Sequence, residues 1–351
     1  MRKLLPIIWV MLCALPMSVS AQQIFIWEGA TSSDWNVGAN WLTFGPGVYP
    51  NTPTDIVLII PAVNNPQLFV SDITVGNIIA TFGASVDLND FTLTIGGGNI
   101  TGATVSDGRI VQVGSSALNF SGSTLSDITF DKSSSSVTNF QNGNTINFAP
   151  ANHFRMLPGA GSIQLGVGTG DTFTGNARFI NNSNSILTIG FEGASIFDGD
   201  VILEQNTPLG EIIFGAGAGT STLANGYIDG TAIHDGTLYL GGIIQQNVGV
   251  SSIIGSAMMG YPHTLDIENS EFAGDLVAIS LGTLSVMNTK MEGLGNYLEA
   301  PEITEIKQSV FVNTAIKKNI TALASDVWFG GNKYDNCTVV NESSFDIRLN
   351  A

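Results

Sequence analysis

The stretch Ile267-Glu-Asn269-Ser-Glu-Phe272 recurs three more times, in altered wording, before residue 335. Each copy begins with an apolar residue, has a small or amide residue two positions later, and ends with an apolar or aromatic residue three positions after that. The later copies read Val286-Met-Asn288-Thr-Lys-Met291, Ile306-Lys-Gln308-Ser-Val-Phe311 and Phe329-Gly-Gly331-Asn-Lys-Tyr334. Their first residues lie 19, 20 and 23 positions apart. A phrase at a period of about 20–25 residues is typical of a solenoid, in which each repeat is one coil.

A second repeat lies earlier in the chain. Phe173-Thr-Gly175 returns as Phe197-Asp-Gly199, 24 positions later, and the amides Asn181 and Gln205 keep the same offset from each Phe. Equivalent positions of stacked coils lie about 4.8 Å apart, so the copies predict stacked aromatic and stacked amide side chains. The predicted core residues are Phe173, Phe197, Phe272, Met291, Phe311 and Tyr334.

Short alternating segments broken by turn residues fill the region from 70 to 150. Examples are Phe91-Thr-Leu-Thr-Ile95 before three glycines and Leu118-Asn-Phe120. Alternation over three to five residues indicates strands and turns, not helices. We therefore predict an all-β fold, a β-solenoid (parallel β-helix) with coils of about 20–25 residues.

Residues 22–61 form a distinct head before the repeats. Trp27, Trp35 and Trp41, three of the four tryptophans that follow position 21, fall within fifteen positions. Indole rings bury large apolar areas and use one N–H to fix their orientation, so we expect the cluster to cap the open end of the core. The second interpretation is a ligand site, with the three aromatic faces stacking against the sugar rings of a glycan.

The pattern Trp27-x-Gly29 … Asp34-Trp35 … Asn40-Trp41 resembles the opening of large secreted surface proteins of Bacteroidetes-type bacteria. The resemblance continues through residues 55–95, and segments within 173–226 and 330–349 resemble repeat units of the same proteins. It implies an adhesin-like repeat protein in which a right-handed parallel β-helix follows a Trp-rich opening segment. The resemblance implies little about activity.

Composition and charge argue against several classes of partner. The net charge is −17 and becomes −19 once Arg2 and Lys3 are removed (−17 − 2), which argues against nucleic acid and anionic membranes. Charged residues make up 12% of the chain, against about 25% in typical soluble domains. Only Cys337 remains after processing, so no intramolecular disulfide can form, and stability must come from coil stacking.

Residues 1–21 have the pattern of a secretory signal peptide. Arg2 and Lys3 precede an apolar segment over residues 4–16, and Val19-Ser-Ala21 is a small-residue exit. No later apolar run approaches the ~18 residues of a transmembrane helix. We expect an exported protein, extracellular or on the outer cell surface, with a signal peptide (1–21), a Trp-rich head (22–61) and a solenoid (62–351). Since the chain stops within a strand-like phrase, we also expect further coils of a longer chain, or a docked partner, at that end.

No catalytic motif stands out. The three histidines lack metal-ligand spacing, and the glycine runs lack the lysine of a phosphate loop. Paired acids serve polysaccharide hydrolases, and some lyases add Ca²⁺-bound carboxylates and a basic residue. Asp-Gly pairs are also ordinary turns, so we predict no cofactor and keep a Ca²⁺ ion bound at such turns as the alternative. The candidate catalytic residues are Asp198, Asp200, Asp229, His234 and Asp235.

One segment fits two patterns. Between residues 301 and 323 the apolar positions come close to helical spacing behind Pro301, yet the residues are β-branched and fit the recurring phrase. We predict strand for 303–316 and keep helix as the alternative.

These patterns favour a non-enzymatic, exported solenoid: a structural or adhesin-like surface module that presents polar turns to a protein or glycan. The alternatives are a carbohydrate-active enzyme on the same fold, and a glycan-binding module acting through the tryptophan head.

Overall fold

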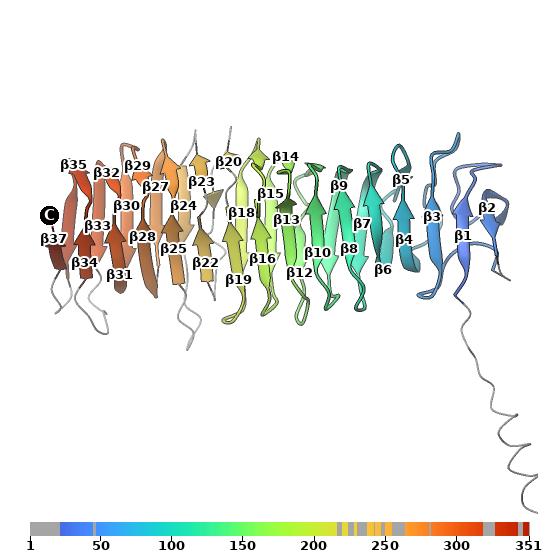
Figure 1. Ribbon diagram of the computed structural model, residues 1–351, viewed down its shortest axis with the longest axis horizontal. Coiled ribbons are helices and arrows are strands. Elements are labelled where there is room, and N and C mark those ends of the chain that lie inside the picture. The colour runs from blue at the N-terminus through green and yellow to red at the C-terminus, as the bar shows by residue number, and fades with distance from the viewer. Residues whose placement is uncertain are drawn as a thin grey trace, which may run out of the picture.

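The computed structural model describes residues 22–44, 47–215, 220–223, 228–229, 237–241, 243–246, 250–254, 264–280, 282–318, 327–342 and 347–350. Figure 1 shows the strands as a single row running from the N-terminal to the C-terminal end of an elongated molecule. With one exception, the described strands pair in parallel, each with the strands one coil before and one coil after it. The predicted all-β solenoid is confirmed.

Three faces make up each coil. The first face contains β1 (Ile24–Trp27), β3 (Ile56–Ile59), β8 (Leu118–Ser121), β10 (Thr138–Gln141), β13 (Ile163–Val167), β16 (Ile186–Ile189), β19 (Glu211–Phe214), β22 (Thr237–Leu240), β25 (Thr264–Glu268), β28 (Thr283–Met287), β31 (Glu302–Lys307), β34 (Val327–Gly330) and β37 (Ile347–Asn350). The second contains β5 (Ser85–Asp87), β11 (Thr145–Asn147), β14 (Thr172–Thr174), β17 (Ile196–Phe197), β20 (Thr220–Leu223), β23 (Ile243–Gln246), β26 (Ser270–Phe272), β29 (Lys290–Met291), β32 (Val310–Val312) and β35 (Lys333–Asp335). The third contains β12 (Phe154–Met156), β15 (Ala177–Asn181), β18 (Val201–Gln205), β21 (Ile228–Asp229), β24 (Val250–Ile254), β27 (Asp275–Ile279), β30 (Asn296–Ala300), β33 (Thr314–Lys318) and β36 (Thr338–Asn341).

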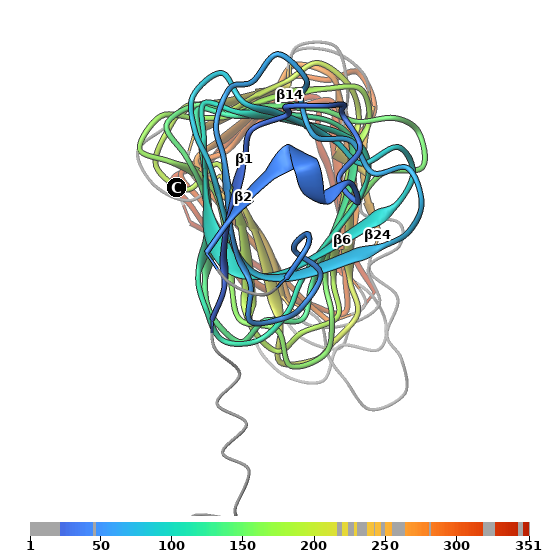
Figure 2. The ribbon, with the colours of Figure 1, turned by 90° about the vertical axis from the view of Figure 1, so that its right-hand side faces the viewer.

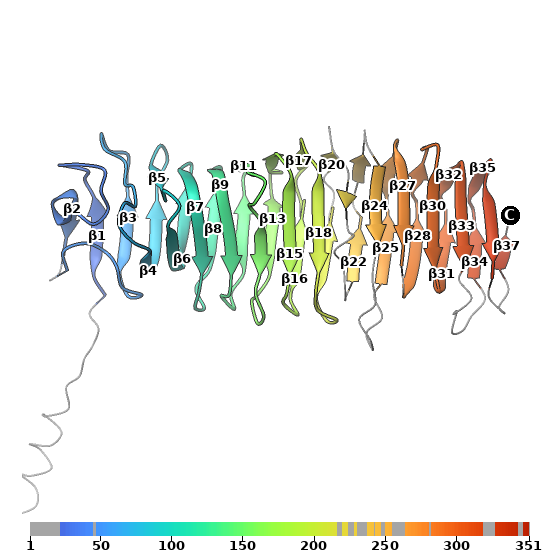
Figure 3. The same ribbon diagram turned by 180° about the vertical axis from the view of Figure 1, so that it is seen from behind.

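Four early strands bend from one face to the next. They are β4 (Ile73–Ala80) and β6 (Thr92–Thr101), which pass from the third face to the first, and β7 (Thr104–Gln112) and β9 (Thr124–Lys132), which pass from the second to the third. Seen from the N-terminal end, the chain turns clockwise as it recedes, so the solenoid is right-handed (Figure 2). Figure 3 shows the opposite side, where the same regular stack continues.

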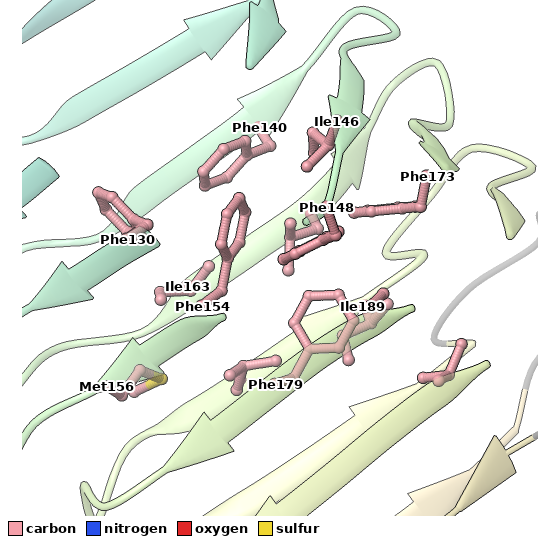
Figure 4. Packing of buried hydrophobic residues seen from close by; sticks show 14 of the residues in the cluster. Phe130, Phe140, Ile146, Phe148, Phe154, Met156, Ile163, Phe173, Phe179 and Ile189 are labelled. Atoms are coloured by element: carbon pink, nitrogen blue, oxygen red, sulfur yellow. The ribbon is translucent and has the colours of Figure 1, made fainter. Parts of the chain in front are cut away.

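The core fills the inside of the coils. Side chains alternate along each strand, so every second residue points inward. The inward aromatic residues of successive coils pack against one another, as Phe130, Phe140, Phe154, Phe148 and Phe179 do in Figure 4. The rings of Phe130 and Phe154 lie 5.6 Å apart, and those of Phe154 and Phe179 lie 6.1 Å apart. One continuous hydrophobic cluster runs through the described coils.

The recurring phrase is confirmed as a coil repeat. Its first residues are register partners on the first face, Ile267 with Val286 and Val286 with Ile306. Its last residues are partners on the second face, Phe272 with Met291 and Met291 with Phe311. The number of residues per coil varies more widely than the predicted ~20–25. Leu284 follows its register partner Leu265 by 19 positions, and Leu265 follows its partner Leu238 by 27.

The middle residue of the phrase forms the corner between the first and second faces. Asn269, Asn288, Gln308 and Gly331 have φ angles of 50°, 45°, 53° and 69°. This left-handed conformation turns the chain, and it favours Gly and Asn over other residues. The repeat of amides therefore marks the corner, and Asn288 Nδ2 donates a hydrogen bond to Asn269 Oδ1 of the preceding coil at 2.8 Å.

The predicted core is confirmed except for one residue. Phe173, Phe197, Phe272, Met291 and Phe311 are buried. Tyr334 is 40% exposed, so its assignment to the core is wrong. Its ring stacks on Phe311, with centroids 5.5 Å apart, but its other side is not covered by any described strand of the second face. The amides Asn181 and Gln205 are register partners, and both are buried.

The ambiguous segment near residue 301 is extended. Strands β31, β32 and β33 cover most of residues 302–318, which confirms strand over helix there. The remainder, 319–323, lies outside the described residues, as do residues 1–21.

The head joins the solenoid directly. β1 pairs in parallel with β3, and β3 with β4, so both belong to the first face. The exception to parallel pairing is β2 (Trp41–Thr43), which runs antiparallel to β1 along the outer edge of the sheet. The short 3-10 helix η1 (Gly38–Asn40) crosses the open end of the coils (Figure 2).

Candidate functional site

The three head tryptophans are buried against one another. The exposed fractions of Trp27, Trp35 and Trp41 are 0%, 0% and 5%, and the ring of Trp41 lies 4.8 Å from each of the other two. Their N–H groups donate to backbone carbonyls: Trp27 to Asn64, Trp35 to Pro50 and Trp41 to Trp35. An arrangement that covers the indole faces and satisfies all three indole N–H groups is that of a cap. None of these three indole rings has an exposed face on which a sugar ring could stack.

A buried asparagine organises the same head. Asn40 Oδ1 accepts from the backbone N–H groups of Thr31 and Ser32, each at 2.9 Å, and its amide donates to Ser32 Oγ and the carbonyl of Asp34. A hollow of about 610 Å³ lies beside the head, lined mainly by Glu28 and residues 60–63. Trp27 also borders this hollow but has no exposed surface.

Two of the predicted acids, Asp198 and Asp200, lie at the corner between the second and third faces, which we call the second corner. Asp198 is exposed, and the half-buried Asp200 precedes β18. The backbone N–H of Asp200 donates to Asn176 Oδ1 of the preceding coil at 3.2 Å. Asp229 lies in β21, in register with Ile202, so it belongs to the next coil of the third face. His234 and Asp235 lie outside the described residues.

The second corner presents polar side chains over several coils. Asp107 and Asp127 hold the left-handed conformation there, with φ angles of 58° and 56°. Two hollows lie along it. One, of about 260 Å³, is lined by Asp90, Gly108, Arg109, Asp127, Thr129 and Asn152, and the other, of about 350 Å³, by Phe148, Pro150, Gly175, Asn176, Arg178 and Ile202. Asp198 and Asp200 thus belong to the same coil as Ile202, at the edge of the second hollow.

The third face next to this corner holds a buried ion cluster. Asp131 is fully buried and accepts from Arg109 Nε and Arg155 Nε, both at 2.7 Å. His153 Nε2 lies 3.6 Å from the same carboxylate. Burial alone would raise the pKa of Asp131, but the nearby His153 and the bonds from Arg155 and Arg109 outweigh it and hold that pKa well below its usual range. The carboxylate therefore stays ionised and links three coils.

A second ion pair lies on the same face, one coil further along. Arg178 Nε donates to Glu204 Oε1 of the next coil at 2.5 Å. Arg178 is register partner of Ile202, two residues from Asp200, so a basic side chain does lie beside the predicted acids. The guanidinium is paired with Glu204, however, and both ion pairs bridge neighbouring coils.

Another acidic group lies on the first face. Tyr239, Asp266, Ser285 and Glu305 are register partners in successive coils. Burial and the neighbouring Glu268 and Glu305 raise the pKa of Asp266, and burial and Asp266 raise that of Glu211. Tyr239 donates to Glu268 Oε2 at 2.9 Å. Clustered carboxyl groups with raised pKa values are a feature of many catalytic sites, and also of crowded acidic surfaces.

The residues of the buried ion cluster around Asp131 were not among those predicted from the sequence. The ion cluster joins residues from three coils whose separations, 22 and 24 residues, differ from each other. A signal did exist: Arg109, Asp131, Arg155, Arg178 and Glu204 recur at roughly one coil length.

The described residues contain no group of three or more His, Cys, Asp or Glu side chains placed to hold a metal ion. Among those residues there is also no helix of the length and hydropathy that crosses a membrane.

No protein-family model, no curated protein and no solved structure matches the chain.

Proposed function

We propose that the chain is an exported, adhesin-like scaffold, a stiff β-solenoid that presents polar surfaces to a glycan or protein partner on the outside of the cell. The observation that supports this best is the use of its polar side chains. Ion pairs of the third face, among them Arg109 and Arg155 with Asp131 and Arg178 with Glu204, bridge successive coils. Outward amides do the same on the first face, where Asn139 donates to Asn119 and Asn119 to Asn99.

Side-chain bonds that connect successive coils in this way favour a mechanical role. Each coil is held to the next by backbone pairing, by core stacking and by these side-chain bonds, so load on one coil passes to its neighbours. The resemblance of the head and repeats to secreted surface proteins of Bacteroidetes-type bacteria supports the same proposal, as does the signal-peptide pattern.

The second corner is the surface we assign to the partner. It has the two hollows, partly exposed guanidinium groups in Arg109 and Arg178, and amides in Asn152 and Asn176. Guanidinium groups donate hydrogen bonds and amide groups both donate and accept them, which matches the hydroxyl groups of sugars. A glycan is therefore the partner class that this corner fits best.

The test uses the purified mature protein on a panel of neutral and acidic polysaccharides, with and without Ca²⁺. The proposal expects retention on at least one polysaccharide and no release of reducing ends or unsaturated products. Arg178→Ala should weaken retention, whereas Lys333→Ala, a change on exposed β35 far along the rod, should not. Product release that is abolished by Asp200→Asn would overturn the scaffold proposal.

A carbohydrate-active enzyme is the second candidate, and the acidic group of the first face favours it. A glycosidase needs one carboxyl group kept protonated near neutral pH, and the raised pKa values of Glu211 and Asp266 move in that direction. Loss of hydrolysis in Glu211→Gln and Asp266→Asn, with Glu292→Gln unchanged, would favour the enzyme.

A further inference from the structure

A lysine side chain lies fully buried inside the solenoid. Lys132 follows Asp131 on β9, and because side chains alternate, it points inward where Asp131 points outward. No ion pair of Lys132 occurs within the described ranges. Its ammonium instead contacts two neutral groups, Gln112 Oε1 at 3.2 Å and Thr138 Oγ1 at 2.9 Å. A buried amine without a counter-ion is costly, which calls for an explanation.

The partner amide is held in one orientation. Gln112 is the register partner of Lys132 one coil earlier, so their backbones lie side by side. The amide nitrogen of Gln112 donates to the carbonyl of Ser116 at 3.1 Å, and its oxygen accepts a close hydrogen bond from Thr138 Oγ1. Gln112, Lys132 and Thr138 are all fully buried. The carbonyl oxygen of Gln112 is therefore polarised by a hydroxyl donor and lies 3.2 Å from the amine nitrogen.

We propose that Lys132 and Gln112 react to form an intramolecular isopeptide bond. The amine Nζ of Lys132 attacks Cδ of Gln112, a new Cδ–Nζ bond forms, and the Cδ–Nε2 bond breaks. One ammonia leaves, so a primary amide and an amine become a secondary amide and ammonia. No electrons are transferred to or from any other group, and the reaction needs no oxidant or co-reactant.

Thr138 is the group that moves the proton. Attack by the neutral amine gives a tetrahedral carbon with a negative oxygen and a positive nitrogen. The Thr138 hydroxyl stabilises that oxygen by donation, and its oxygen already accepts from Nζ. It can take the surplus proton from Nζ and pass one to Nε2, which then leaves as ammonia. Ser116 holds the leaving nitrogen by accepting its hydrogen bond until that step.

Two further features support the reaction. Burial lowers the pKa of Lys132 to about 8, so a share of the amine is neutral, and therefore nucleophilic, near neutral pH. Fixed contact between amine and amide also replaces the improbable encounter of two free groups, which is worth effective concentrations of about 10⁵–10⁸ M in well-oriented cases. The product would close the 112–132 loop covalently in a protein whose only described cysteine, Cys337, is unpaired.

Peptide mass spectrometry of the folded, purified protein tests the bond. Trypsin, applied after denaturation, cleaves after Arg109, Lys132 and Arg155. An unlinked chain gives peptides 110–132 and 133–155 at full mass. A linked chain gives one species, 110–155, lighter by one ammonia and uncut at Lys132, because the amine has been consumed. Full recovery of 110–132 at its complete mass would overturn the proposal.

Two variants sharpen the result. Lys132→Met removes the amine, and Met156 already occupies the equivalent position one coil later, so the side chain fits the row. This variant should show no ammonia loss in the region 110–155 and a lower melting temperature than the linked protein. Thr138→Val removes the hydroxyl, and the linked fraction should fall at least tenfold after equal incubation. An unchanged linked fraction in Thr138→Val would overturn the assigned role of Thr138.

Discussion

The rings of Phe173 and Phe197 lie face to face, with centroids 4.4 Å apart and planes 2° from parallel. The two residues are 24 positions apart in the sequence and are register partners on the second face. Both are buried, so each ring covers one face of the other inside neighbouring coils. Coil stacking in this protein is therefore carried by side chains as well as by backbone pairing.

Removing one ring of this pair should destabilise the fold strongly. Phe197→Ala leaves a cavity next to Phe173 and Phe214, and we expect a loss of about 3–5 kcal/mol in the free energy of unfolding. The neighbouring Ile196 is 46% exposed, so Ile196→Ala should cost less than about 1 kcal/mol. Chemical denaturation measures both. Equal losses in the two variants would contradict the assigned stacking.

At the corner between the first and second faces, we expect a substitution that preserves or raises stability. Gln308 holds a φ angle of 53°, which is unfavourable for a residue with a β-carbon, and Gly331 takes the equivalent place one coil later. Gln308→Gly should therefore leave stability unchanged or raise it by up to about 1 kcal/mol. Gln308→Val should lower it, because β-branched residues are strained there. Denaturation midpoints that fall equally for Gly and Val would refute this account of the corner.

A buried carboxyl group should make stability depend on pH. Burial raises the pKa of Asp171 to about 6, although bonds from Asn144 and Gly166 oppose the shift. In the unfolded chain this pKa is about 3.9. Folding thus favours the protonated form of Asp171. The contribution of this group to the free energy of unfolding is therefore fully present below about pH 4 and is lost as the pH rises through 6. The difference between the folded and unfolded pKa values corresponds to about 3 kcal/mol of stability.

The control for that prediction is Asp171→Asn. Asn144 occupies the equivalent position one coil earlier, so an amide fits the row. The difference in unfolding free energy between the native chain and this variant should change by about 3 kcal/mol between pH 4 and pH 7. Because other carboxyl groups titrate equally in both proteins, their effect cancels. A difference that does not vary with pH would show that Asp171 does not titrate there.

Sequence periodicity was sufficient for the fold because the same residue types recur at the same place in each coil. Ile267, Val286 and Ile306 are apolar at one face position, and Asn269, Asn288 and Gln308 mark the following corner. Each position is fixed by a local requirement, either burial or a positive φ, that the residue type itself reports. Such requirements can be identified in a single chain.

The polar groups followed no such local rule. In Phe130-Asp131-Lys132, alternation puts Phe130 and Lys132 on the same inward side, yet a lysine is expected to reach solvent. The ammonium group of Lys132 stays inside because it contacts Gln112 and Thr138, which come from other strands. Tyr334 fits the phrase as well as Phe311 does, and its exposure depends on the neighbouring coil, not on the residue itself.

The direct test of the central claim, that residues one coil apart lie side by side in parallel register, is a pair of cysteines. Asn119 and Asn139 are outward register partners on the first face, and Asn139 Nδ2 donates to Asn119 Oδ1 at 3.0 Å. In a Cys337→Ser background, Asn119→Cys with Asn139→Cys places the two sulfurs within disulfide range, since the backbones lie about 4.8 Å apart. The matched control, Asn119→Cys with Gln141→Cys, moves one partner two residues along the same strand. The account predicts that mild oxidation, followed by peptide mass spectrometry, finds the 119–139 disulfide and leaves the 119–141 pair reduced. A 119–141 disulfide, or two pairs that both stay reduced, would contradict it.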